Sequence, residues 1–195
     1  MSFKKMFIAL FATMMLASSS FAAEEYKTDR AHSSVEFTVR HFMINKVRGE
    51  FKDFTANATY DAEDMSAWSV TATIQTASID TENEKRDDHL RSADFFDAAN
   101  NPEITFKSKS ITKEGDGYVA IGDFTMRGVT KEIKLPFEIT GQITDPWGNK
   151  RIGIEASLTI NRQDYGVSWS KSMDNGGLVV SDEVKIELNM EFVAK

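Results

Sequence analysis

The stretch Val184-Lys185-Ile186-Glu187-Leu188-Asn189-Met190-Glu191-Phe192 alternates strictly between apolar and polar side chains. Successive side chains of a β-strand point to opposite faces, so a period of two predicts a strand with one face buried and the other in water. An amphipathic helix would instead place its apolar residues three and four positions apart. The C-terminal segment is therefore expected to form one wall of a β-protein.

The same alternation recurs along the chain and gives eight candidate strands in all. The other seven lie at residues 35–39, 47–60, 68–74, 104–106, 120–126, 133–139 and 152–160. Within 47–60 the apolar positions change from odd to even near Lys52 and Asp53, which predicts a bulge or bend there. Short turns such as Glu114-Gly115-Asp116-Gly117 and Arg127-Gly128 connect neighbouring strands and make them antiparallel.

One stretch interrupts the β pattern. Thr81 and Glu84 have the spacing of a capping box, and good helix formers follow, so one helix is expected at about 82–92, between the third and fourth strands. A single helical turn is expected at Arg162 to Tyr165, where Gly166 would end it.

One helix cannot cover the apolar faces of eight strands, so the sheet has to cover itself. We therefore expect an all-β protein, an eight-stranded antiparallel barrel that leaves no exposed sheet edge. A two-sheet sandwich is the alternative, but strands of ten or more residues favour the tilted strands of a barrel.

The N-terminus has the pattern of a secretory signal peptide. Lys4 and Lys5 precede an apolar run of eleven residues, Met6 to Leu16, and the small residues Ser20 and Ala22 follow. We expect residues 1–22 to be removed on export, which leaves residues 23–195 as one barrel domain. A bilayer span needs about 20 apolar residues, so the mature protein is not expected to span a membrane.

Charge and cysteine content narrow the chemistry further. Without the two lysines of the leader the chain has 21 basic and 30 acidic residues, a formal charge of −9. Nucleic acid and anionic membrane surfaces are poor partners for such a chain. The absence of Cys excludes thiol catalysis and Cys metal sites.

The inward faces of the expected strands mix large and small side chains. Eight-stranded barrels lie between a filled interior and one that holds a single small ligand. The large inward residues are Phe37, Phe106, Phe124 and Phe137, and the small ones are Ala56, Ala58, Ala72, Ser108, Ser110, Ala120, Gly122 and Ala156. Small residues leave space for an apolar ligand unless large neighbours fill it, and composition leaves both outcomes open.

Several blocks of sequence, in order, carry a family resemblance. They are Ala31 to Phe37 with Val47 to Phe51, Arg86 to Asp97, Asn101 to Ile111, Gly122 to Leu135, and Asn161 to Trp169. Together they resemble the YceI-like family of bacterial polyisoprenoid-binding proteins over essentially the whole mature chain. The departures are slight: Arg30 and Tyr165 stand where the family often has Pro and Phe.

The resemblance implies a lipocalin-like barrel in the periplasm that encloses an isoprenoid, an isoprenoid quinone or a long-chain alkyl lipid. It implies no catalytic residue, cofactor or metal, so we expect a binding or carrier protein rather than an enzyme. Family members are commonly dimeric, which suggests a homodimer. The expected ligand-binding residues are Phe37, Val39, Phe51, Phe95, Phe96, Phe106, Ser108, Ala120, Gly122, Phe124, Phe137, Leu158, Ile160 and Trp169.

Two other functions stay open at this point. A lipid- or quinone-modifying enzyme would use the cavity as its active site, with His41 as the one inward-tending titratable candidate. An envelope stress protein would act through its surface instead.

The segment Arg86 to Arg91 is too polar for a core and is expected over the barrel wall or mouth. It would be a lid if Phe95 and Phe96 line the pocket entrance, and a plug otherwise.

Two charged candidates have structural explanations. His89, with the acidic residues around it, matches no metal-ligand spacing and is better explained by helix capping and local hydrogen bonds. Arg162 is expected to form an ion pair that closes the barrel.

Overall fold

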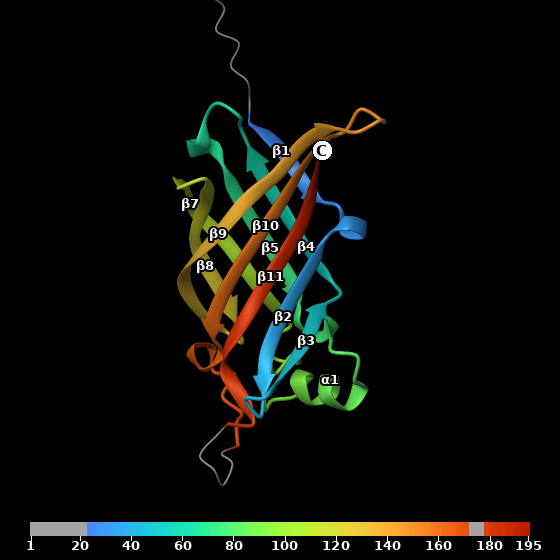
Figure 1. Cartoon of the computed structure of the whole chain (residues 1–195), viewed down its shortest axis with the longest axis vertical. Helices are drawn as coiled ribbons and strands as arrows, with labels where there is room; N and C mark the ends of the chain where they lie inside the picture. The colour runs from blue at the N-terminus through green and yellow to red at the C-terminus, as the bar shows by residue number, and fades with distance from the viewer. Residues whose placement is uncertain (1–22, 172–177) are drawn as a thin grey trace, which may run out of the picture.

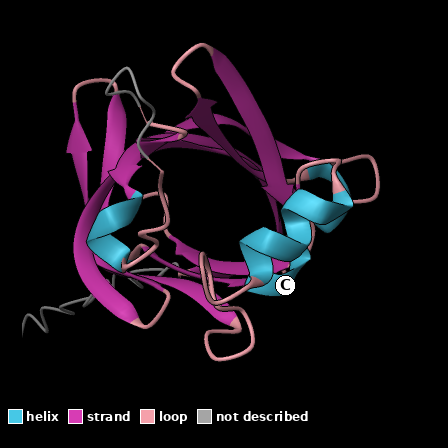
Figure 2. Cartoon of the chain, turned by 90° about the horizontal axis from the view of Figure 1, so that it is seen from below, coloured by secondary structure: helices cyan, strands magenta, loops and turns pink. Residues whose placement is uncertain are grey.

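The computed structural model describes residues 23–171 and 178–195, so the expected signal peptide lies outside the described residues. These residues form one antiparallel sheet closed into a barrel, with α1 at one end (Figures 1 and 2). The elements are β1 (Glu24–Thr28), β2 (Ser34–His41), β3 (Asn45–Phe51), β4 (Phe54–Tyr60), β5 (Ser69–Gln75), β6 (Ile79–Asp80), α1 (Glu84–Arg91), β7 (Glu103–Glu114), β8 (Gly117–Met126), β9 (Val129–Thr144), β10 (Lys150–Asn161) and β11 (Val180–Ala194).

The eleven sheet segments build eight barrel strands, because β1 with β2, β3 with β4, and β5 with β6 are interrupted halves of single strands. The barrel closes where β11 pairs with β2 along most of its length and with β1 near its C-terminal end. The predicted all-β, eight-stranded antiparallel barrel is confirmed, with its helix between the third and fourth strands. The sandwich alternative is not the fold.

The three interruptions lie side by side. The predicted bend at Lys52 and Asp53 is a full break between β3 and β4, and short 3₁₀ turns at Arg30–His32 and Thr76–Ser78 break the two neighbouring strands. The Lys52 amide donates to the Ser78 carbonyl at 3.0 Å, and the Arg30 guanidinium donates to the Lys52 carbonyl. Polar backbone groups freed by the breaks therefore pair with one another.

The helix is shorter than expected, and the predicted capping box is wrong. Asn83 caps α1, since its Oδ1 accepts a hydrogen bond from the Arg86 amide at 3.0 Å. Thr81 instead donates from its backbone and its hydroxyl to Asp87 Oδ1, at 3.0 and 2.5 Å. The 3₁₀ turn at Arg162–Tyr165 is confirmed, and Gly166 ends it with φ +73°. No helix in the described parts of the chain has the length and apolarity needed to cross a bilayer.

Arg162 forms the predicted ion pair, to Asp182 at 3.2 Å, and is buried. Its guanidinium also donates to the Ser181 and Trp169 carbonyls, at 2.9 and 2.8 Å, and to that of Val167. These bonds fasten the segment after β10 to the start of β11. A buried charge with this many acceptors is satisfied, whereas removal of the guanidinium would leave buried carbonyls unpaired.

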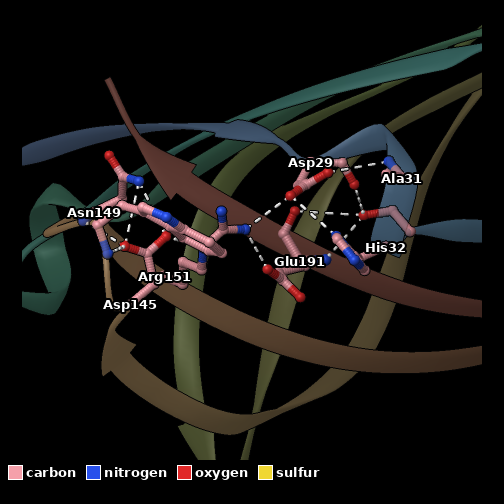
Figure 3. A network of polar contacts seen from close by, with 9 residues as sticks. Asp29, Ala31, His32, Asp145, Asn149, Arg151 and Glu191 are labelled. Atoms are coloured by element: carbon pink, nitrogen blue, oxygen red, sulfur yellow. Dashed lines mark hydrogen bonds and ion pairs between the residues drawn. The ribbon is translucent and has the colours of Figure 1, made fainter.

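A second arginine joins the elements where the barrel closes. Arg151 on β10 donates to Asp29 beside β1, to Asp145 in the β9–β10 turn, and to Glu191 on β11 (Figure 3). Hydrogen bonds from Arg151 and then His32 lower the pKa of Asp29 to about 2. Desolvation opposes the shift at Asp145, but hydrogen bonds from Asn149 and Arg151 still hold the pKa of that carboxyl below its usual range.

These two lowered pKa values predict acid-sensitive stability. Because both folded-state values lie below the unfolded value of about 3.9, the ionised carboxylates stabilise the fold above that pH, and the contribution is lost as pH falls toward 2. Arg151→Met removes their shared partner, so its unfolding free energy should fall less between pH 5 and pH 2.5 than that of the unmodified chain. Urea unfolding across this range measures the difference.

The matched control is Lys109→Met, which breaks exposed ion pairs to Asp123 and Glu132 and should leave the pH slope unchanged. An Arg151→Met slope as steep as that of the unmodified chain would contradict the assignment.

Candidate functional site

The barrel encloses a cavity of about 470 Å³, a volume typical of small-molecule sites, which span roughly 300–1,000 Å³. Its lining extends from Tyr60 and Trp68 near one end of the barrel to His41 and Val47 near the other, where α1 lies (Figure 1). Nearly all of the lining is apolar. The cavity is therefore an elongated apolar space inside the sheet.

Partial exposure of inward-facing side chains shows that the interior is open. Along β9 the inward residues Ile133, Leu135, Phe137 and Ile139 are only half-buried, and each lies between exposed outward neighbours. A close-packed core would bury such side chains completely. Their remaining exposure faces the cavity, so large neighbours do not fill the space that small residues leave.

Twelve of the fourteen predicted ligand-binding residues line the cavity. They are Phe37, Val39, Phe51, Phe95, Phe96, Phe106, Ala120, Phe124, Phe137, Leu158, Ile160 and Trp169. The structure brings them together from six barrel strands, the α1–β7 segment and the segment after β10. Their contact with a ligand stays a prediction.

The other two, Ser108 and Gly122, do not line the cavity, and the inward placement of Ser110 is also wrong. The Ser108 hydroxyl accepts a hydrogen bond from the Val70 amide at 2.9 Å, which ties β7 to β5. The β7–β8 register then shifts between Ser108 and Ser110, so Ser110 is exposed and Ile111 faces the cavity instead. Alternation alone could not show this, because a bulge reverses the face of every residue that follows it.

Gly122 is small for a different reason than the sequence suggested. A Cβ added there would lie 2.7 Å from the Ser108 Cα, and closer still to the Lys107 carbonyl oxygen. Glycine thus permits a close approach of two strands rather than opening the cavity.

Aromatic side chains gather at the α1 end of the cavity. His89 on α1 lies 5.0 Å from Phe95 and 5.2 Å from Trp169, centroid to centroid, and Phe95 and Trp169 are 5.1 Å apart. All three line the cavity, as does Phe96, whose ring meets that of Phe51 edge-on at 6.0 Å. The segment after α1 is therefore part of the cavity wall at this end. Because Phe95 and Phe96 line the cavity, this arrangement agrees better with the predicted lid than with the plug.

A second aromatic group lies at the opposite end. Trp68 contacts Tyr60 at 4.7 Å and Tyr118 at 5.0 Å, and Tyr118 stacks on Phe137 at 5.4 Å. Tyr60 and Trp68 line the cavity but were not among the predicted site residues. The sequence did offer a signal for them, because each lies at the end of a predicted strand and the ends of the strands form the mouths of a barrel.

The few polar groups of the lining are held by structural bonds. Arg86 donates to the Thr81 hydroxyl and carbonyl, both at 2.7 Å. Burial, followed by a hydrogen bond to Glu24, raises the pKa of Tyr26 to about 12. His41 lines the cavity as expected, but its ring contacts Phe42 and no described carboxylate. The described lining thus offers no nucleophile activated by a positioned base.

Histidines and acids elsewhere are engaged in local contacts. His89 Nε2 lies 2.9 Å from Asp94 Oδ2, and Asp87 accepts from Thr81. Asp29, His32 and Glu191 bring candidate metal ligands within 4.8 Å of one another. Arg151 already pairs with both of those carboxylates (Figure 3). A cation there would have to compete with the guanidinium.

Comparison with known proteins assigns the fold to a family. A model of the YceI-like domain matches residues 26–192, nearly all of the described barrel. The chain belongs to the YceI-like family. The family match confirms the resemblance drawn from the sequence blocks.

One curated relative and two solved structures illustrate the similarity. It is 41% identical to Protein YceI of Escherichia coli O17:K52:H18 over 167 residues, which cover 84% of this chain and 87% of that protein. The crystal structure of Burkholderia cenocepacia BcnA superposes with a TM-score of 0.74 at 26% identity, over 84% of this chain and 98% of that one.

The third is a polyisoprenoid binding domain from Saccharophagus degradans implicated in plant cell wall breakdown. It superposes with a TM-score of 0.60 over 87% of this chain and 98% of that domain, at 15% identity, and so supports the fold alone.

The tight strand crossing at Gly122 gives a testable consequence. Gly122→Ala should destabilise the barrel by about 1–3 kcal/mol, because the new methyl group collides with the β7 backbone. Gly141→Ala is the matched control, since an added Cβ there meets nothing within 4 Å. Urea midpoints compare the two variants, and equal midpoints would contradict the close approach.

Proposed function

We propose that this YceI-like protein is a carrier that encloses one isoprenoid, isoprenoid quinone or long-chain alkyl lipid and performs no chemistry on it. The observation that carries the proposal is the open cavity of about 470 Å³ with a nearly continuous apolar lining. Such a lining recognises length and apolarity rather than a pattern of polar groups. The Saccharophagus degradans neighbour with the same fold is a polyisoprenoid binding domain, so the fold is compatible with this class of ligand.

The energetics favour a chain-like ligand. Each buried methylene contributes about 0.8 kcal/mol, so ten buried carbons contribute roughly 8 kcal/mol before ordering costs reduce it. No charged partner is needed for affinity on this scale. The described cations nearest the cavity, Arg86 and Arg162, are already hydrogen-bonded to protein oxygens.

We further propose that the carrier works in the periplasm. The support is the N-terminal pattern of Lys4, Lys5 and the apolar run that follows them. An aqueous compartment between two membranes is where an enclosed apolar chain needs a carrier.

The direct test is mass spectrometry of an organic extract from the purified protein. A stoichiometric apolar compound is expected. An empty barrel that also takes up no isoprenoid, quinone or alkyl lipid on incubation would overturn the proposal.

A cavity-filling variant tests the site itself. Ala156 on β10 is half-buried and faces the cavity, so Ala156→Phe places a ring in the ligand's path. Displacement of about two methylenes costs near 1.6 kcal/mol, or roughly a 15-fold loss of affinity. Fluorescence competition with a polyene fatty acid measures the loss.

The matched control is Ser157→Phe, at the next residue of the same strand, which is exposed and points outward. It should bind normally. Equal affinities of the two variants would place the ligand outside the barrel.

A further inference from the structure

The turn between β2 and β3 exposes three consecutive apolar side chains, which we call the hairpin tip. Phe42, Met43 and Ile44 are 41%, 47% and 84% exposed. Single exposed apolar residues are ordinary in soluble proteins, whereas a contiguous apolar group on a projecting turn marks an interaction site.

The backbone of the hairpin tip is unsuited to the residues that occupy it. Phe42 and Met43 have φ of 51° and 62°, the left-handed conformation that Asn and Gly adopt readily in tight hairpins. The turn is held by two hydrogen bonds, from the Ile44 amide to His41 and from the Phe42 amide to Val179. Folding alone favours other residues here, and strain of this kind gathers at functional sites.

Three cations flank the hairpin tip. Arg40 lies directly opposite Lys46 in the β2–β3 register, Arg48 is opposite Thr38, and all three cations are exposed. Like charges directly opposite one another destabilise a sheet. None of the three forms an ion pair within residues 23–171 and 178–195, and residues 38–49 contain no acid. An anionic partner would relieve the repulsion.

The hairpin tip lies at one end of the cavity. His41 and Val47, on the two strands just behind it, both line the cavity, and the turn projects from the α1 end of the barrel (Figure 1). Other exposed apolar side chains lie at the opposite end: Ile143 near the end of β9, and Trp147 in the turn between β9 and β10. The two ends can therefore be tested against each other.

We propose that the hairpin tip docks the barrel on a lipid bilayer with anionic headgroups, so that the α1 end of the cavity faces the membrane. Interfacial binding combines burial of apolar side chains at the acyl boundary with attraction of basic residues to lipid phosphates, and the turn supplies both. The proposal rests on the proposed carrier function, for which a membrane is the source or destination of the ligand.

The negative charge of the whole chain does not prevent this contact. At 0.1 M salt charges are screened beyond about 10 Å, so the cations beside the hairpin tip dominate at the point of contact. The helix α1 lies at the same end of the barrel, but its three acids, Glu84, Asp87 and Asp88, balance Lys85, Arg86 and Arg91, so it offers no net positive charge for docking. The charge pattern thus selects the turn.

Co-sedimentation of residues 23–195, which contain every barrel strand, with vesicles of phosphatidylethanolamine and phosphatidylglycerol tests the proposal. Phe42→Asn/Met43→Gly installs residues that the turn conformation prefers, so the thermal midpoint should hold or rise while vesicle affinity falls at least roughly ten-fold. Arg40→Gln/Lys46→Gln should lower affinity by a similar factor and reduce its salt dependence.

The matched control, Ile143→Ser/Trp147→Ser at the opposite end, should bind vesicles as the unmodified chain does. No vesicle binding by the unmodified chain, full binding by the hairpin-tip variant, or an equal loss in the control would overturn the proposal. The proposal would also fail if the hairpin-tip variant bound vesicles normally but lost a dimer seen for the unmodified chain in analytical ultracentrifugation. The partner of the hairpin tip would then be a second copy of this chain.

The extraction experiment separates the two proposals. If the barrel is empty but binds vesicles, the carrier proposal fails, and with it the reason given for docking. If the barrel contains lipid but does not bind vesicles, only the docking proposal fails.

Discussion

Closure of the sheet on itself is the constraint on which the rest of the structure depends. Every strand presents one apolar face, and the single α-helix of the described chain is too short to cover them. β11 meets this constraint by pairing with β10 on one side and with β2 and β1 on the other. Arg151 then joins Asp29 beside β1 to Glu191 on β11 at the closure, and Arg162 fastens the segment after β10 to the start of β11. The cavity is a product of this closure, since eight strands enclose more volume than their own inward side chains fill.

Much of this architecture could be predicted because the two-residue period is strong. Long stretches of β9, β10 and β11 alternate between apolar and polar residues, and this pattern predicted the fold class and most of the cavity lining. β1 escaped notice because its five residues carry one large apolar side chain, Tyr26, and β6 because it has two residues.

Prediction failed where a backbone irregularity or a tertiary contact replaced the local rule. The bulge at Ser108 reversed the face of Ser110, and the clash at Gly122 gave a structural reason for a residue that composition assigned to the cavity. Thr81 had the spacing of a helix cap, but its hydroxyl instead donates to Asp87 and accepts from Arg86. His89 joined an aromatic group with Phe95, a residue six positions on, and with the distant Trp169, which no local spacing indicates.

The aligned breaks in three neighbouring strands give the barrel wall two kinds of mechanical behaviour. Five strands, β7 to β11, carry long ladders, whereas the remaining side is jointed at residues 29–33, 52–53 and 76–78. Local opening is least costly where ladders are short or interrupted. Local widening of the barrel should therefore be easiest along this jointed side, while the long ladders of the other side resist it.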